Sequence, residues 1–164
     1  WVSIVGDLPG RGSVYAIAED HVNPNLLFAG TEFGVFFTID GGANWVQLKS
    51  GLPTIAIRDI AIQQRENDLV LASFGRGFYV LDDYSTLREL TSENLEKEAH
   101  IFPVKSALEY IPTNQLGLRG RGHQGESFYL ADNPDFGATI RFYLKESPES
   151  LIEKRKKDME EGDI

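Results

Sequence analysis

The first half of the chain alternates short apolar runs with clusters of turn-forming residues, a pattern typical of β-strands. Leu26-Leu27-Phe28-Ala29 and Val35-Phe36-Phe37 are apolar at consecutive positions, so both faces of their sheet must be covered. Turn residues precede the first run at Asn23-Pro24-Asn25 and follow the second at Asp40-Gly41-Gly42. The pattern predicts strands at residues 13–19, 26–31, 35–39, 45–49, 57–62, 69–74 and 77–81.

The predicted strands belong to an internal repeat of the sequence. Trp1-Val2-Ser3-Ile4 matches Trp45-Val46-Gln47-Leu48 at an offset of 44 residues. Residues 14–40 then match residues 57–83 at an offset of 43, which places Leu26 on Leu69, Ala29 on Ala72 and Gly34 on Gly77. We therefore expect two units of four strands, although the fourth strand of the second unit has no clear pattern.

Units of four short strands and about 40 to 45 residues, apolar on both faces, are typical of β-propeller blades. A propeller ring needs about four to eight blades, so two units form only part of one. Because Trp1 aligns with Trp45, we expect the sequence to begin at the end of a preceding unit. The expected partners of these two units are the missing blades of the parent chain.

The segment from Thr38 to Trp45 has the composition of a closed loop. Asp40 can accept hydrogen bonds from loop N–H groups, Gly42 can adopt a positive φ, and Trp45 can pack its ring beneath the loop. The segment resembles the Asp-box, with Asn44 in place of the usual Thr. In families that carry it, the box is a structural hairpin between the third and fourth strands of a blade. The resemblance thus implies structural roles for Thr38, Asp40, Gly42 and Trp45.

Together these features resemble the Asp-box, or BNR-repeat, propellers. Among these, the sequence pattern most resembles that of the sortilin-like propellers of large bacterial exported proteins. Such propellers are often labelled glycosyl hydrolases. Residues 73–83 are similar to the final blade of such propellers, in which the box is lost. The resemblance covers residues 1–84 and implies an extracellular, periplasmic or cell-surface location. No cysteine-rich module follows, as it does in eukaryotic sortilin, so a receptor role is not implied.

Residues 85–132 have the composition of a connection. Ser92 is the predicted N-cap of a short helix that runs to Ala99. Ile101-Phe102-Pro103-Val104 is predicted to be a strand that closes the last blade, and a Gly-rich stretch follows it.

Residues 133–164 form the last predicted segment. Residues 133–145 resemble the first strand of the Ig-like sandwich that follows sortilin-like propellers. A terminal helix is predicted to begin with Ser147 as its N-cap and Pro148 at its first position. The fold class expected for the whole chain is therefore mainly β, with two blades, a connection, one Ig-like strand and a terminal helix.

Composition and charge exclude several classes of function. Sixteen Lys and Arg against 25 Asp and Glu give a net charge of −9, which disfavours nucleic acids and anionic membranes as partners. The absence of Cys excludes disulfides, thiolate metal sites and Cys nucleophiles. The three His have no metal-ligand spacing and no P-loop is present, so we predict no metal and no cofactor. No apolar run reaches the roughly 18 residues of a membrane span.

The propeller interpretation indicates where a ligand would bind. Loops that join a fourth strand to the next first strand share a face with the hairpins between strands two and three. The candidate ligand face consists of Arg11, Glu32, Arg58, Asp59 and Arg76. A turn or surface role is the competing interpretation for each of these residues.

Two functions from different classes remain open. The first is an exported propeller that binds protein or glycan as a scaffold, with no catalytic residue in this sequence. The second is part of a glycoside hydrolase, sialidase- or xyloglucanase-like, whose carboxylates, roughly 5 to 10 Å apart, lie partly in missing blades. The usual arginine motif of sialidases is absent here. Under either hypothesis, exposed sheet faces and unpaired strand edges should drive self-association.

Overall fold

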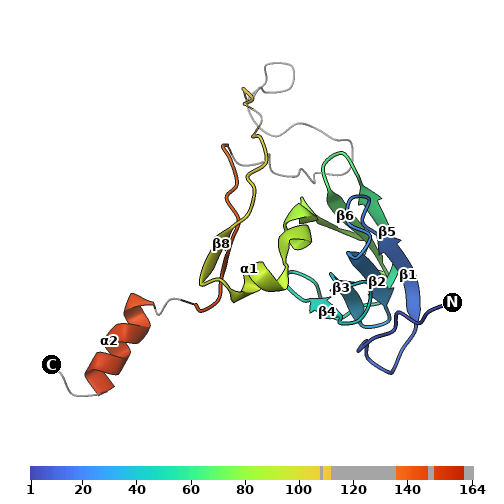
Figure 1. Ribbon diagram of the computed structural model, residues 1–164, viewed down its shortest axis with the longest axis horizontal. Coiled ribbons are helices and arrows are strands. Elements are labelled where there is room, and N and C mark those ends of the chain that lie inside the picture. The colour runs from blue at the N-terminus through green and yellow to red at the C-terminus, as the bar shows by residue number, and fades with distance from the viewer. Residues whose placement is uncertain (108, 112–135, 148–149, 161–164) are drawn as a thin grey trace. The chain divides into compact units, whose positions relative to one another are not determined.

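The computed structural model describes residues 1–107, 109–111, 136–147 and 150–160. In these residues the strands form three sheets, ordered β1-β2-β3-β4, β5-β6-β7 and β8-β9 (Figure 1). The predicted mainly-β class is confirmed. The described sheets do not close into a ring.

All seven predicted strands are present, and each end lies within one residue of its prediction. Neighbouring strands pair antiparallel in both repeat units. The first sheet contains β1 (Val14–Glu19), β2 (Leu27–Thr31), β3 (Gly34–Thr38) and β4 (Val46–Leu48), and the second contains β5 (Ile57–Gln63), β6 (Asp68–Ser73) and β7 (Phe78–Leu81).

The strand register corrects the repeat alignment in the second strand of each unit. Ala16 pairs with Gly30 in the first sheet. Asp59, which lies 43 residues after Ala16, pairs with Ala72 in the second sheet. Ala72 lies 42 residues after Gly30, so the offset predicted from the sequence is wrong by one residue in this strand.

Two matching hydrogen bonds support the corrected alignment. The hydroxyl of Thr31 donates to the carbonyl of Gly34 at 2.9 Å, and the hydroxyl of Ser73 donates to that of Gly77 at 2.7 Å. The turn after Ser73 is therefore one residue longer than the turn after Thr31. Since a slip of one residue turns every side chain of a strand to the opposite face, Leu69 corresponds to Leu27 and not to Leu26.

The corrected alignment shows that the two sheets stack with equivalent faces pointing the same way. Leu69 and Leu71 of the second sheet face the first sheet. Their equivalents, Leu27 and Ala29, lie in a separate cluster on the opposite face of the first sheet. Two sheets that buried equivalent faces against each other would have placed all four side chains in one core.

The other faces of the sheets follow the same rule. Phe28 and Phe37 of the first sheet pack in the core between the sheets. Their equivalents are Val70 and Val80. Val70 points away from that core because it alternates with Leu69 and Leu71 along β6, and Val80 does so because it pairs directly across from Val70. Val80 is 56% exposed. The outer face of the second sheet thus repeats the apolar pattern that the first sheet buries.

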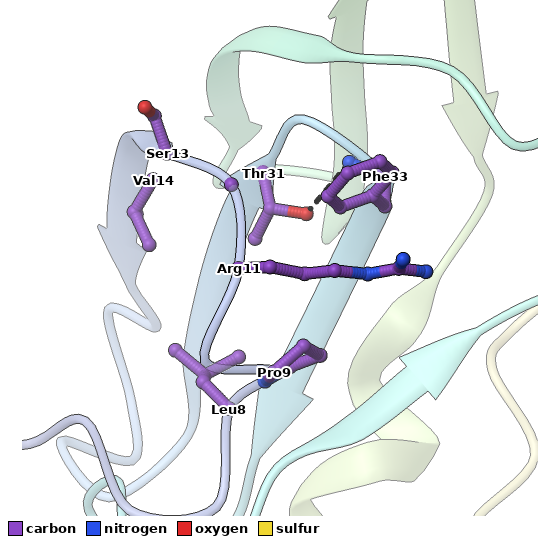
Figure 2. Close-up of a pocket in the computed structure, with 8 residues that line it drawn as sticks. Leu8, Pro9, Arg11, Ser13, Val14, Thr31 and Phe33 are labelled. Atoms are coloured by element: carbon purple, nitrogen blue, oxygen red, sulfur yellow. Dashed lines mark hydrogen bonds between the residues drawn. The ribbon is translucent and has the colours of Figure 1, made fainter.

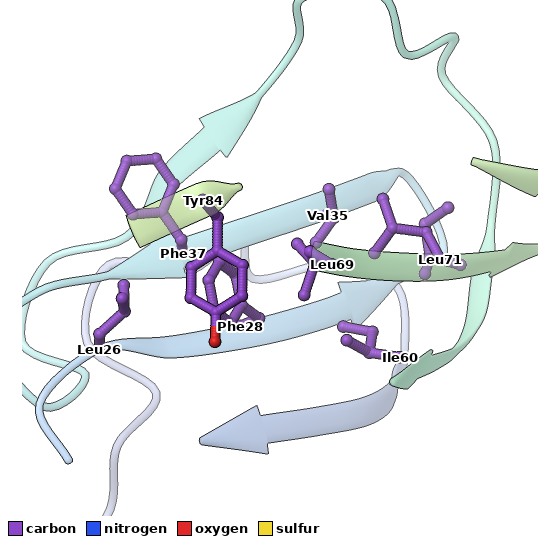
Figure 3. Close-up of a cluster of buried hydrophobic side chains, with 9 residues drawn as sticks. Leu26, Phe28, Val35, Phe37, Ile60, Leu69, Leu71 and Tyr84 are labelled. Carbon is purple, nitrogen blue, oxygen red and sulfur yellow. The ribbon is translucent and has the colours of Figure 1, made fainter. Parts of the chain in front are cut away.

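The core between the two sheets also contains a side chain from beyond β7 (Figure 3). Tyr84 opens the 3-10 helix η1 (Tyr84–Glu89) and is 1% exposed. Its ring meets Phe28 edge-on, with 5.1 Å between ring centroids. Residue 84, the predicted end of the propeller segment, is therefore a core residue, and η1 packs with the sheets.

The predicted helix from Ser92 to Ala99 is shorter than expected. It is α1 (Ser92–Glu96), and its N-cap is Thr91, whose hydroxyl accepts a hydrogen bond from Asn94 N–H at 3.3 Å. Ser92 is therefore the first helical residue and not the cap.

The predicted closing strand at residues 101–104 is wrong. The strand found there is β8 (Ala99–Ile101), and it pairs with β9 (Phe142–Leu144) instead of β7. Pro103 explains the early end of β8, because proline has no N–H to give to a strand ladder. Beyond this strand, the Gly-rich stretch falls outside the described residues.

The terminal helix begins later than predicted. It is α2 (Leu151–Glu160), and the hydrogen bonds of Ser150 identify this residue as its cap. Ser150 Oγ accepts from Glu153 N–H at 3.2 Å, and Glu153 Oε2 accepts from Ser150 N–H at 2.9 Å. This reciprocal capping box places the helix start after Ser147, while Pro148 lies outside the described residues.

The chain divides into two compact units. One consists of residues 1–100 and 143–164, and contains the two stacked sheets. The other spans residues 101–142; in its described part, the rings of Tyr110 and Phe136 stack with centroids 4.5 Å apart.

Candidate functional site

The residues of the predicted ligand face lie at one edge of the stacked sheets, where β1 and β5 begin. Backbone hydrogen bonds tie the neighbouring turns to this edge. Glu32 N–H donates to Ser13 carbonyl at 3.0 Å, and Phe74 N–H donates to Ala56 carbonyl at 2.8 Å. The loops before β1 and β5 therefore lie beside the turns β2–β3 and β6–β7.

Arg58 links the two sheets at this edge. Its guanidinium carbon lies 4.0 Å from the centroid of the Tyr15 ring and 5.0 Å from that of the Phe74 ring. Tyr15 is 37% exposed and Phe74 is 66% exposed, so the stack faces solvent. These contacts are cation–π interactions, which hold the planar guanidinium in a defined orientation.

Arg11 makes a similar contact in the first unit (Figure 2). Its guanidinium carbon lies 5.0 Å from the centroid of the Phe33 ring, and the two side chains extend side by side from the loop and the turn. Gly12 allows this arrangement, since its φ is +85° and a Cβ there would lie 2.6 Å from the Phe33 ring. The small pocket next to them has a volume of about 20 Å³ and is lined by Leu8, Pro9, Arg11, Gly12, Ser13, Val14, Thr31 and Phe33.

The other three predicted residues are exposed and take no part in these arginine–aromatic contacts. The Asp59 carboxylate accepts a hydrogen bond from the Ile60 N–H at 2.9 Å. Glu32 lies in the β2–β3 turn close to Gly12. Arg76 lies in the β6–β7 turn. We name the side chains that do form stacks, Arg11, Tyr15, Phe33, Arg58 and Phe74, the arginine–aromatic edge.

Sequence reasoning selected the arginines of this edge and missed all three rings. A ring contact between Arg58 and Tyr15 depends on how β5 packs against β1. Gly30 contributes to that packing, because a Cβ at this position would lie 2.9 Å from the carbonyl oxygen of Ile57. The available sequence signal was that Tyr15, Phe33 and Phe74 lie at the same ends of the predicted strands as the candidate arginines.

Asp40 closes the loop between β3 and β4. Its carboxylate accepts hydrogen bonds from the hydroxyl of Thr38 at 2.6 Å, from Ala43 N–H at 2.9 Å, and from the Asn44 N–H and side-chain amide at 2.9 and 2.7 Å. These bonds, with that from Thr38 the strongest, hold the pKa of Asp40 well below its ordinary range. Gly42 has a φ of +99°, as predicted. Both Asp40 oxygens are thus occupied by the loop itself.

Trp45 anchors the loop from beneath. It is 7% exposed, and its indole N–H donates to the carbonyl of Ile4 at 3.1 Å. Its backbone N–H donates to the carboxylate of Asp7 at 2.6 Å. The segment before β1 is therefore fastened to the loop that follows β3, and the geometry of Thr38, Asp40, Gly42 and Trp45 is that of a structural hairpin.

A buried carboxylate lies at the opposite ends of β1 and β5. Asp20 is 2% exposed and receives two hydrogen bonds from Arg88, at 2.8 and 2.7 Å, and one from the Tyr84 hydroxyl at 2.6 Å. Arg88 also donates to the side chain of Asn67 at 2.7 Å. The N–H of Asn23 donates to the same carboxylate at 2.8 Å.

These contacts determine the ionisation of the Asp20 cluster. Burial by itself would raise the pKa of Asp20, but the hydrogen bonds from Arg88 and Tyr84 and the charge of Arg88 lower it well below its ordinary range. Burial and the bond to Asp20 raise the pKa of Tyr84, and the bond to Asp20 raises that of Arg88. Asp20 is thus an ionised, fully paired group that links the β1–β2 turn to η1.

Comparisons of the chain with protein-family models, with curated proteins and with solved structures found no match. Within the described residues, no three His, Asp or Glu side chains are grouped closely enough to hold a metal ion. None of the helices in the described part of the chain has the length and apolar character needed to cross a bilayer.

Proposed function

We propose that the two sheets are consecutive blades of an Asp-box propeller, sortilin-like in type, that serves an exported protein as a scaffold for binding protein or glycan. Catalysis by the residues of this chain is not part of the proposal. The observation that carries it is the stacking of equivalent sheet faces in the same direction, since this is how blades follow one another around a ring.

The edge of β7 supports the proposed architecture. β4 pairs with β3 in the first unit, whereas no described strand pairs with the outer edge of β7 in the second. An apolar cavity of about 200 Å³ lies beside β7, and its lining includes Leu48, Leu52, Leu71 and Tyr79. A fourth strand equivalent to β4 would lie next to this cavity.

The outer face of the second sheet supports further stacking. Phe78 and Val80 are 75% and 56% exposed, although their equivalents in the first sheet, Val35 and Phe37, are buried. Exposed apolar faces of this kind are uncommon on isolated soluble domains and mark interaction surfaces. The next blade of the ring is the occupant that the repeat itself provides.

Light scattering tests the proposed architecture on the present chain. We expect the average mass to increase with protein concentration, because the open face and edge associate. The double substitution Phe78→Lys and Val80→Lys should reduce this increase, whereas Ile152→Lys on the exposed side of α2 should not. A monodisperse monomer at all concentrations would contradict the proposal.

Assays for sugar release test the scaffold function. The chain, and a longer parent containing it, should release no reducing sugar from a panel of polysaccharides and sialosides. Release that disappears in the Glu32→Gln or Asp59→Asn variant would replace the scaffold with a glycoside hydrolase. Folding of each variant is checked by circular dichroism.

A further inference from the structure

The arginine–aromatic edge has the chemistry of a recognition surface, and this inference rests on the proposed scaffold function. We propose that it binds an acidic linear segment of a partner protein. The guanidinium of Arg58 binds a carboxylate of that segment, and the exposed ring of Phe74 contacts an apolar side chain of the same segment.

The geometry of Arg58 leaves its hydrogen-bonding capacity available. Its guanidinium carbon lies over the rings of Tyr15 and Phe74, at 4.0 and 5.0 Å from their centroids. Its N–H groups make no hydrogen bond or ion pair with any described residue. The adjacent carboxylate of Asp59 is engaged by the Ile60 N–H instead. A guanidinium that is held by aromatic rings keeps its N–H groups for a carboxylate, which it can bind with two parallel hydrogen bonds.

The edge is built for a protein segment more than for a sugar or a small molecule. The pocket beside Arg11 has a volume of about 20 Å³, enough for a water molecule and too small for a sugar ring. The guanidinium groups already occupy one face of each of the rings Tyr15, Phe33 and Phe74. A shallow surface that combines exposed aromatic rings with arginine has the composition of protein–protein hot spots.

Charge complementarity selects an acidic partner. The chain carries a net charge of −9, yet Arg11, Arg58 and Arg76 all lie at this edge, with Glu32 and Asp59 as the acidic residues of the predicted face. The edge is therefore locally positive on an acidic protein. An acidic segment is attracted to it and repelled by the rest of the surface, which favours binding at this place. A nucleic acid would meet the same repulsion over a larger area.

Selection from a phage library of random ten-residue peptides tests the proposal. The wild-type chain is the bait, and the Arg58→Ala variant is used for counter-selection. We expect enriched peptides to carry Asp or Glu within two positions of an aromatic or large aliphatic residue. Failure to enrich any peptide, or enrichment of peptides without acidic residues, would overturn the proposal.

Fluorescence anisotropy with an enriched peptide separates recognition from general charge attraction. We expect binding to weaken at least tenfold in Arg58→Ala. It should weaken about fivefold in Arg58→Lys, which keeps the positive charge and loses the two parallel N–H donors of the guanidinium. Phe74→Ala should weaken it severalfold. Arg65→Ala, an exposed arginine paired with its neighbour Glu66 at 3.1 Å, is the matched control and should bind like the wild type. Equal binding by Arg58→Ala, or by a peptide with Gln in place of its acids, would overturn the proposal.

Two further results keep this inference distinct from the proposed function. Arg58-dependent binding of a uridine oligonucleotide, without peptide binding, would overturn the choice of partner. Reducing-sugar release together with Arg58-dependent peptide binding would overturn the scaffold function and leave the recognition surface in place. Self-association without peptide binding would overturn the recognition surface and leave the proposed propeller architecture in place.

Discussion

The two repeat units use an aspartate at the same position in different ways. Asp40 and Asp83 are 43 residues apart and both follow the third strand of their unit. After Asp40, two glycines with φ values of +73° and +99° let the chain turn back into β4. After Asp83 the chain enters η1, and the Asp83 carboxylate accepts bonds from the N–H and hydroxyl of Ser85.

The difference lies in the residues after the aspartate. Gly41 and Gly42 tolerate a positive φ, so the Asp40 loop closes on itself and depends on local contacts. In the second unit Tyr84 takes the place of the first glycine, and its ring fills the core between the sheets. One carboxylate thus stabilises a hairpin, while the other begins a helix that connects the second unit to the first through Asp20.

Removing Arg88 is the strongest test of the connection through η1. Arg88→Ala leaves Asp20 buried without its cation, and we expect a loss of about 3–5 kcal/mol in the free energy of unfolding. Urea denaturation measures this loss. Arg65→Ala, an exposed arginine, should change stability by less than about 0.5 kcal/mol. A loss below about 1 kcal/mol for Arg88→Ala would mean that η1 does not depend on this ion pair.

A methyl group at Gly30 tests the close approach of the two sheets. The added Cβ would lie 2.9 Å from the carbonyl oxygen of Ile57 and 3.0 Å from its side chain. Gly30→Ala should therefore cost about 2 kcal/mol through overpacking, as measured by thermal unfolding. The equivalent residue of the second sheet is already Ala72, and Ala72→Gly should cost less than about 1 kcal/mol. Equal effects at the two positions would contradict the stacking derived from the register.

Substituting the paired aspartates sharpens the comparison between the units. Asp40→Ala should cost about 1–2 kcal/mol, since the hydrogen bonds that it removes are partly exposed to solvent. Asp83→Ala should cost about 1 kcal/mol as the loss of a helix cap. Amide hydrogen exchange locates the effects: faster exchange is expected at Ala43 and Asn44 in the first variant, and in η1 in the second. Faster exchange throughout both units in the Asp40 variant would contradict its local role.

Acidification should lower the free energy of unfolding by a smaller amount per pH unit than the substitutions above. Asp20 and Asp40 have folded-state pKa values below the ordinary value of 3.8, so their stabilisation is present above that pH and is lost as the pH falls below it. The free energy of unfolding should fall below pH 4 by at most about 1.4 kcal/mol per pH unit from Asp20. The exposed Asp40 should contribute less.

Two variants separate these contributions. Asp20→Asn should remove most of the decrease in unfolding free energy below pH 4, whereas Asp40→Asn should leave most of this decrease in place. Urea midpoints between pH 2.5 and pH 7 measure the curve. A wild-type chain of equal stability at pH 3 and pH 6 would contradict the ionised state of Asp20.

Local patterns were sufficient for the strands and the Asp40 loop. Apolar runs bounded by turn residues gave each strand end within one residue, and the positive φ of Gly42 followed from its place after an aspartate. These features depend on residues close in the sequence. The predicted caps at Ser92 and Ser147 failed because another Ser or Thr stood nearby, and only the backbone conformation decided which one capped the helix.

Contacts between distant residues could not be predicted. Arg88 reaches Asp20 across 68 positions, and Arg58 reaches the Tyr15 ring across the packing of β5 on β1. β8 pairs with β9, about 40 residues further along the chain, although the pattern around Ile101 suited a strand beside β7 equally well. No spacing rule relates such residues.

The sequence by itself determined the repeat, the strands and the closed loop at Asp40, because each results from interactions within a few residues. The tertiary structure decided which face of each strand is buried. One extra residue in the turn between Ser73 and Gly77 shifts the second strand by one position, and a shift of one reverses every side chain. In β6 that reversal places Leu69 against the first sheet. It makes equivalent faces of the two sheets point the same way.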